Sequence, residues 1–123
     1  MKSGSKYKNR IILRTPEGLQ PFFLYEILYC EADGNYTLFH IVGRVSATII
    51  CQTLKKTEQE LHSKDFFRTD KSYLVNLPHI KTFKRGISII VLDNDEQVPV
   101  SRRNKKKFLI TWKGSNDSAD LSA

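Results

Sequence analysis

Basic side chains crowd the segment 101–113, which holds six bases and no acid. An arginine guanidinium can grip guanine O6 and N7 with two hydrogen bonds, and a lysine ammonium can serve guanine or phosphate. Clustered cations therefore favour a polyanionic partner, nucleic acid first and an anionic membrane surface second, while the plain alternative is a solvated helix face. The six bases are Arg102, Arg103, Lys105, Lys106, Lys107 and Lys113.

The residue types that catalysis and metal binding need do not occur in the required arrangements. None of the six glycines forms a Gly-x-Gly pair, so neither a dinucleotide fingerprint nor a phosphate-binding loop is present. His40, His62 and His79 have no histidine or cysteine at the short spacings of metal sites. Glu58 and Glu60 lie on a polar helical stretch, where solvation is the expected role. We therefore predict no catalytic residue, no metal ligand and no cofactor, and the chain is not expected to be an enzyme.

Length and composition indicate one folded domain. The 123 residues carry 20 bases and 13 acids, a net charge of +7, and 40% hydrophobic residues exclude intrinsic disorder. No apolar run approaches the ~20 residues that span a bilayer, and the first residues lack the apolar block of a secretory signal. We expect a cytoplasmic protein with no membrane partner, whose Cys30 and Cys51 are buried, reduced thiols.

Turn residues divide the first fifty positions into five short apolar runs. Pro16 and Gly18 end the first run, Asp33-Gly34-Asn35 is a strong hairpin signal, and Gly43 precedes the last run. The predicted strands are 10–15, 22–25, 27–32, 36–42 and 45–50.

The second half predicts two short helices and further strands. Thr53 can cap a helix at 53–61, and Ser101 can cap a last helix that places Phe108 and Trp112 on one side. Phe66 and Phe67 form an apolar anchor between the first helix and the later strands. The predicted strands are 72–76, 80–83, 87–92 and 97–100, the last confined to a sheet edge by Pro99.

Three separated motifs, in this order, resemble the LytTR family of bacterial DNA-binding domains. They are Ile-Leu-Tyr-Cys-Glu-Ala-Asp-Gly-Asn-Tyr at 27–36, Phe-Arg-Thr-Asp-Lys-Ser-Tyr-Leu-Val-Asn at 67–76 with Ile80 following, and Val-Pro-Val-Ser-Arg-Arg at 98–103. The resemblance covers about residues 10–112. It implies a mainly β, elongated fold of small antiparallel sheets with two short helices. The expected divisions are a basic leader or linker remnant at 1–9, the domain at 10–113 and a disordered tail at 114–123.

The resemblance also implies a function. Members of the family act as output domains of response regulators in two-component systems, and their loops enter successive major grooves of promoter DNA. Here we expect sequence-specific binding to double-stranded DNA, as a dimer on paired repeats, with a receiver domain or a sensor kinase as a further partner. The implied DNA-binding residues are Asn35, Tyr36, Thr37, Arg68, Lys71, Ser72, Arg102, Arg103 and Asn104, with Lys106 contributing regardless of base sequence.

Within this set some roles stay open. Arg103 is the first choice for base contact, although Arg102 or Arg103 could instead grip phosphate and position the helix. Either Asn35 or Tyr36 could face DNA, and Tyr36 could equally be a core aromatic. Asp70 departs from the family pattern, which commonly has histidine there, so next to DNA it should pair with Lys71 or accept a hydrogen bond from a cytosine amine.

The alternative function is a basic β module for RNA or for an anionic membrane surface. An RNA binder needs aromatic side chains on an open sheet for base stacking. Phe22, Phe39, Tyr73 and Phe83 instead lie in predicted strands that should face the core.

Overall fold

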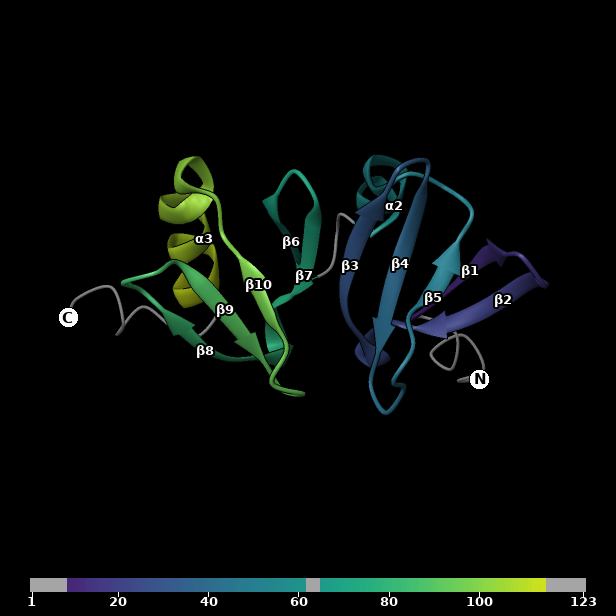
Figure 1. Ribbon diagram of the computed structural model, residues 1–123, viewed down its shortest axis with the longest axis horizontal. Coiled ribbons are helices and arrows are strands. Elements are labelled where there is room, and N and C mark those ends of the chain that lie inside the picture. The colour runs from purple at the N-terminus through teal and green to yellow at the C-terminus, as the bar shows by residue number, and fades with distance from the viewer. Residues whose placement is uncertain (1–8, 62–64, 115–123) are drawn as a thin grey trace, which may run out of the picture.

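Short antiparallel strands make up most of the molecule, which is elongated in Figure 1. The structure, a computed structural model, describes residues 9–61 and 65–114. The strands are β1 (Arg10–Thr15), β2 (Gly18–Phe23), β3 (Ile27–Asp33), β4 (Tyr36–Ile41), β5 (Thr48–Ile50), β6 (Phe66–Asp70), β7 (Tyr73–Asn76), β8 (Ile80–Lys84), β9 (Ile89–Leu92) and β10 (Gln97–Pro99). The helices are α2 (Leu54–Glu60) and α3 (Arg102–Gly114), with short 3-10 turns η1 (Leu24–Glu26) and η2 (Leu77–His79). The mainly β fold with small antiparallel sheets and two helices is as predicted.

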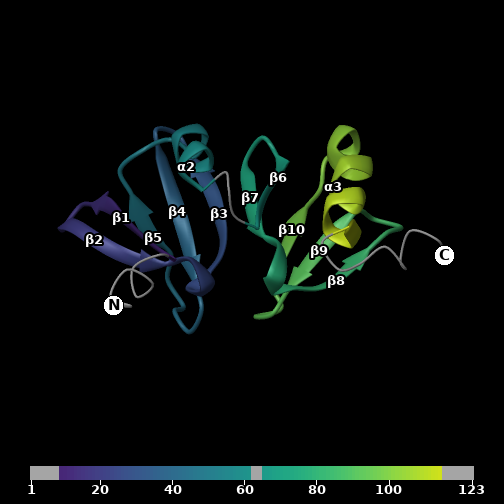
Figure 2. The same cartoon turned by 180° about the vertical axis from the view of Figure 1, so that it is seen from behind.

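The strands form three sheets. A central five-stranded sheet has the order β5-β4-β3-β7-β6, the β1–β2 hairpin stands beside β5, and a three-stranded sheet has the order β10-β9-β8. Figures 1 and 2 show β1, β2 and α2 in one half of the molecule and β8, β9, β10 and α3 in the other, with β6 and β7 between the halves. Pro99 lies in the edge strand β10, as predicted.

Strands β3 and β7 are shared by two hydrophobic core clusters. Side chains alternate across a strand, so Cys30 and Leu74 face the first cluster while Tyr29 and Val75 face the second. This two-sided burial explains the unbroken apolar run at the start of β3. The first cluster comprises Leu13, Phe22, Ile27, Cys30, Phe39, Ile41, Ile50, Leu54, Leu61 and Leu74. The second comprises Leu28, Tyr29, Val75, Leu77, Ile90, Leu92, Val98, Val100 and Phe108.

One contact stabilises the start of α2, and another packs α3 against the core. The Thr53 hydroxyl caps α2 by accepting a hydrogen bond from the Lys56 amide at 3.2 Å, as predicted. Phe108 is the buried residue of α3, and its ring lies 5.8 Å from Phe67 and 5.1 Å from Phe83. The predicted aromatic face of the last helix is therefore a core contact.

Polar contacts join the two halves. His40 on β4 stacks on Tyr29 with ring centroids 4.0 Å apart, and one ring nitrogen lies 3.8 Å from Glu96 in the β9–β10 turn. Burial, reinforced by a hydrogen bond with Glu96, raises the pKa of Tyr29. His79 bridges the same turn to the first half, with one ring nitrogen 2.9 Å from Asp93 and the other 2.6 Å from the Tyr25 carbonyl oxygen. The halves are thus held in a defined relation.

Several predicted strand bounds are wrong. The predicted strand 22–25 is instead β2, ending at Phe23, because the Glu26 carboxylate accepts the Phe23 amide at 2.9 Å and closes η1. The predicted strand 45–50 begins only at Thr48, because just three residues pair with β4, and Val45 is fully exposed. The predicted strand 87–92 begins at Ile89, since Ser88 adopts a φ of 57° and turns the chain.

The structure also differs from the predictions for Ser101 and Cys51 and bears in part on those for the chain ends. Ser101 does not cap α3 with its side chain, because its buried hydroxyl has no partner and its backbone amide bonds to the Thr69 carbonyl oxygen at 2.9 Å. Both cysteines are free, but only Cys30 is buried, whereas Cys51 is half-buried. The predicted leader and tail fall mainly on residues 1–8 and 115–123, outside the described residues, and Gly114 is the last residue of α3.

Candidate nucleic-acid interface

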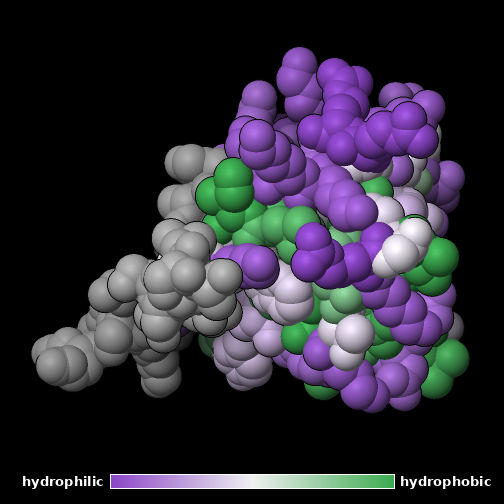
Figure 3. Space-filling view, turned by 90° about the vertical axis from the view of Figure 1, so that its left-hand side faces the viewer, coloured by the Kyte–Doolittle hydropathy of each residue, from purple (hydrophilic) through white to green (hydrophobic). Residues whose placement is uncertain are grey.

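Three loops lie along one long edge of the molecule. The β3–β4 turn, the β6–β7 turn and the start of α3 all reach the upper edge in Figure 1, and the reverse view agrees. In Figure 3, which looks at the α3 end with the same edge uppermost, hydrophilic residues cover this edge. We refer to the β3–β4 turn, the β6–β7 turn and residues 101–104 as the first, second and third loops.

The first loop is a tight hairpin turn that depends on glycine. Asp33 and Tyr36 form the last pair of β3 and β4, and Gly34 takes a φ of 62°, which side chains rarely adopt. Asn35 is exposed, and Tyr36 is 51% exposed, so Tyr36 is not a core aromatic. Both side chains face solvent at the edge.

The third residue of the predicted first-loop set, Thr37, is fully buried. Its hydroxyl donates to the Gln52 carbonyl oxygen at 2.9 Å and lies 3.4 Å from the Thr57 hydroxyl of α2. The structure therefore corrects Thr37 from a DNA contact to a support that ties the first loop to α2, because its polar group is used inside the fold.

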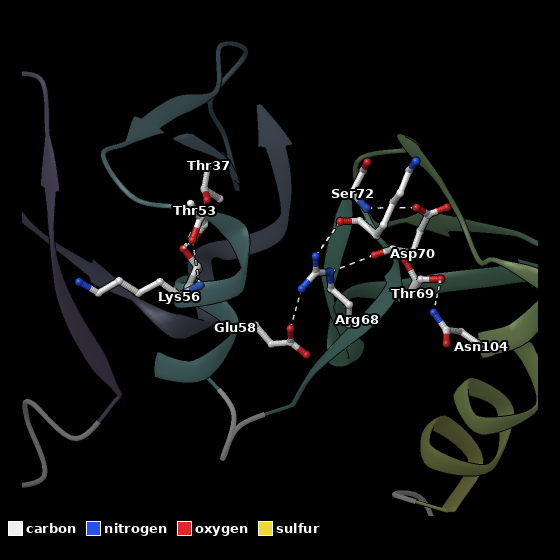
Figure 4. Close-up of polar contacts among 11 residues, drawn as sticks. Thr37, Thr53, Lys56, Glu58, Arg68, Thr69, Asp70, Ser72 and Asn104 are labelled. Atoms are coloured by element: carbon white, nitrogen blue, oxygen red, sulfur yellow. Dashed lines mark hydrogen bonds and ion pairs between the residues drawn. The ribbon is translucent and has the colours of Figure 1, made fainter. Parts of the chain in front are cut away.

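In the second loop, Arg68 is committed to contacts within the protein (Figure 4). Its Nε donates to the Asp70 carbonyl oxygen at 3.0 Å and its Nη2 to the Lys71 carbonyl oxygen at 2.7 Å. Its Nη1 pairs with the Glu58 carboxylate of α2 at 2.6 Å. Arg68 lies within β6 and not in the turn, and a bulge at Thr69 carries the strand into that turn.

The Asp70 carboxylate has a partner within the protein that the sequence analysis did not name. Its carboxylate accepts a hydrogen bond from the Ser72 backbone amide at 3.1 Å, which closes the second loop across Lys71. The Ser72 carbonyl oxygen accepts the Ala32 amide at 2.8 Å and so links the second loop to β3. Lys71 is exposed at the tip, while Ser72 is half-buried.

The third loop is attached to the second. The Thr69 carbonyl oxygen accepts both the Ser101 amide at 2.9 Å and the Asn104 side-chain amide at 3.3 Å. Arg102, Arg103 and Lys106 are exposed. The second and third loops together line a depression of about 410 Å³, formed by Arg68, Asp70, Lys71, Ser101, Arg103 and Asn104.

Of the predicted residues, the structure brings Arg68, Lys71, Arg103 and Asn104 around one depression, and Asn35 and Tyr36 belong to the next turn along the edge. Sequence reasoning missed Glu58, which was expected to be merely solvated. Its pairing with Arg68 spans ten positions in the chain, and no local pattern marks it.

Three features of the described ranges bear on the alternatives of a metal site, a membrane span and a base-stacking surface. Within residues 9–61 and 65–114, no three histidine, cysteine, aspartate or glutamate side chains gather where they could hold a metal ion. The helices of these ranges are all too short or too polar to cross a membrane. Phe22 and Phe39 are fully buried, and Tyr73 and Phe83 are half-buried against the second core cluster, so these four aromatics offer no open stacking surface.

Comparisons with known proteins point to one family of DNA-binding domains. The family model of the LytTr DNA-binding domain matches residues 18–112. The CO-responsive transcriptional regulator RcoM of Rhodospirillum rubrum is 31% identical over 80 residues, which cover 62% of this chain and 33% of RcoM, so the match spans about a third of that relative. A solved LytTr DNA-binding domain, from a Bacillus cereus protein described as a methyl-accepting/DNA response regulator, has a TM-score of 0.70 and 27% identity, and the match covers 85% of this chain and 96% of that one.

Proposed function

The chain belongs to the LytTR family of DNA-binding domains, and from this premise we propose that it binds double-stranded DNA sequence-specifically by inserting its three edge loops into successive major grooves. The single observation that supports this proposal most strongly is the alignment of the three loops along one edge of an elongated molecule. A rigid sheet with functional loops at one edge is suited to reading several positions along a duplex.

The side chains that remain available at the edge have the required chemistry. Arg103 can hold guanine O6 and N7, and Lys71, which lines the same depression, can contact guanine or phosphate. Asn35 can bond to adenine with its side-chain amide. Lys106, exposed on α3, fits a phosphate contact that strengthens binding to any sequence.

The proposal extends to assembly. One module of this size makes few phosphate contacts, so pairing on two repeats would supply the remaining affinity. We propose that the domain acts as a dimer on paired promoter sites, under the control of a receiver domain or a sensor kinase. A regulator that acts on promoters works in the cytoplasm.

A selection of preferred duplexes from random DNA tests this function. It is repeated over a series of salt concentrations, with RNA and non-specific DNA as competitors. We expect an enriched, repeated motif and a log-log salt slope of about −5 for roughly six phosphate contacts. An equally steep slope without an enriched motif, or equal competition by RNA, would contradict the proposal and favour a general polyanion binder.

A further inference from the structure

We propose that Arg68 is a positioning residue for DNA recognition, which orients Lys71 and Arg103 through the second loop and does not itself contact DNA. This inference rests on the proposed function, because it assigns to Arg68 a part in the same binding event.

The three contacts of Arg68 use the geometry of its guanidinium group. Two of its nitrogens hold the carbonyl oxygens of Asp70 and Lys71, consecutive residues of the second loop, at 3.0 and 2.7 Å. A third contact, at 2.6 Å, anchors the same group to Glu58 on α2. A planar fork can make these contacts together, whereas a lysine ammonium on a flexible stem cannot reproduce them.

A direct DNA contact by Arg68 would oppose its present environment. Only 27% of its side chain is exposed, and its charge is already paired with a carboxylate. A phosphate approaching Arg68 would also approach Glu58, which is 41% exposed and would repel it. The pair therefore suits a bracing role better than a contact.

We call the Arg68–Glu58 pair, with the two loop carbonyl oxygens that Arg68 holds, the brace. Through Thr69 the brace also reaches the third loop. Thr69 is fully buried between Arg68 and Asp70, and its carbonyl oxygen holds the Ser101 amide and the Asn104 side chain. A shift of the second loop would therefore move the start of α3, where Arg103 lies. Figure 4 shows Arg68 between Glu58 on one side and Thr69, Asp70 and Asn104 on the other.

The same brace reaches the first loop through α2. Thr57 precedes Glu58 on this helix, and its hydroxyl lies 3.4 Å from the hydroxyl of Thr37, which follows the first loop. The contacts of Arg68 and Glu58 thus reach, through α2, the strand that follows the first loop.

The variant Glu58→Gln separates two explanations, because a purely electrostatic role of Glu58 and a positioning role through Arg68 predict opposite changes in DNA affinity. Removing a negative charge near DNA should strengthen binding to every duplex if only electrostatics matter. If Arg68 is braced by Glu58, the preferred duplex should instead bind less tightly, and its advantage over a scrambled duplex should fall. Glu60→Gln is the matched control, because Glu60 is exposed on the same helix and, within the described residues, its carboxylate accepts its hydrogen bond from the half-buried Gln52 side chain at 2.9 Å and not from Arg68.

Arg68→Lys is the second variant, and it keeps the charge while removing the fork. We expect the ratio of preferred to scrambled affinity to fall roughly tenfold, since hydrogen bonds to a charged group are lost. The salt slope should stay unchanged, because no phosphate contact is lost. In a Lys71→Ala background the further loss should shrink, since part of the effect acts through Lys71.

Two results would overturn the inference: Arg68→Lys with a wild-type affinity ratio, or Arg68→Ala with a salt slope reduced by about one, the sign of a lost phosphate contact. Thermal unfolding of each variant separates a loss of folded protein from a loss of discrimination. If the wild-type protein shows no sequence preference, the proposed function fails. The brace itself is still tested without DNA, by faster amide exchange at Ser72 and Asn104 in Arg68→Lys.

Discussion

The first and second loops are both hairpin connections of the same sheet, yet they are held in different ways. In the first loop, Gly34 takes a positive φ, and within the described part of the chain the Asn35 side chain has no hydrogen-bond partner. In the second loop, a larger set of contacts from Arg68, Asp70 and Glu58 fixes the turn. The first loop is therefore shaped by backbone preference, whereas the second is shaped by side-chain contacts, one of which reaches Glu58 on α2.

This difference suggests that the loops contribute to DNA recognition in different ways. The tip of the first loop, Gly34 and Asn35, takes its shape from local backbone preference, so it is suited to adjusting one part of the recognised sequence. A turn braced to α2 and to the third loop transmits any change to Lys71 and Arg103 together. The second and third loops should therefore act as one unit, while the first acts more independently.

The largest effect is expected from Phe108→Ala, which removes the aromatic that anchors α3 beneath the third loop. Phe108 is fully buried against Phe67 and Phe83, and such truncations cost ~3–5 kcal/mol of unfolding free energy. Urea denaturation measures the loss. Ile110→Ala, on the same helix but 58% exposed, is the control and should change stability little. A cost below ~1 kcal/mol for Phe108→Ala would show that α3 is not anchored there.

Arg103→Ala tests base reading by the second and third loops. We expect a loss of ~1–3 kcal/mol on the preferred duplex and a relaxed preference at one base position. Lys106→Ala, another exposed base of α3, should weaken binding to all sequences alike. Titrations of both variants on preferred and scrambled duplexes make the comparison. Equal, sequence-blind losses for the two would remove Arg103 from base reading.

Gly34→Ala tests the local origin of the first loop. Alanine at a φ of 62° is strained even though the site has open space, so we expect ~1–2 kcal/mol lower stability. Gly86→Ala is the matched control, because Gly86 also has open space but no positive φ, and it should be neutral or slightly stabilising. Thermal unfolding of both variants decides the matter, and equal effects would show that backbone strain is not what the first loop depends on.

Asp70 variants test how far a side-chain hydrogen bond shapes the second loop. Asp70→Ala removes the acceptor of the Ser72 amide and should cost ~0.5–1.5 kcal/mol of stability. Asp70→Asn keeps an acceptor oxygen and removes the charge, so it should retain the turn and bind DNA more tightly. Weaker DNA binding by Asp70→Asn than by Asp70→Ala would contradict this role.

The smallest expected effect is a difference in the rate at which the two cysteines of the unaltered protein react with a thiol reagent. Burial raises the pKa of the Cys30 thiol, so its reactive thiolate is suppressed in the folded protein. We expect a thiol reagent to label half-buried Cys51 first and Cys30 only after unfolding. Early labelling of Cys30 would show that β3, which carries the first loop and pairs with β7, opens readily.

The sequence predicted those features that depend on neighbouring residues. The turn around Gly34, the Thr53 cap and the edge position of Pro99 follow from local chemistry, and the structure confirms all three. The family motifs placed the three loops. The predicted strand bounds were wrong where a side-chain contact ends the strand, as the hydrogen bond from the Phe23 amide to Glu26 does.

Two residues of the predicted site share one physical feature. Thr37 and Arg68 have residue types that suit DNA, but their polar groups are used by partners 15 and 10 positions away, Gln52 and Glu58. Such partners are set by how the strands and α2 pack, which no local spacing reveals. Exposure, and not residue type alone, distinguishes the candidates Asn35, Tyr36, Lys71, Arg102, Arg103 and Lys106 from these two.

The most direct test of the account is methylation interference on a selected duplex. Methylation of guanine N7 blocks the major groove at that base and leaves the minor groove and the phosphates unchanged. We predict interference at groups of guanines about one helical turn apart on one face of the duplex, with one group lost in Arg103→Ala. Binding that is insensitive to N7 methylation at every guanine would contradict reading of the major groove by the three edge loops.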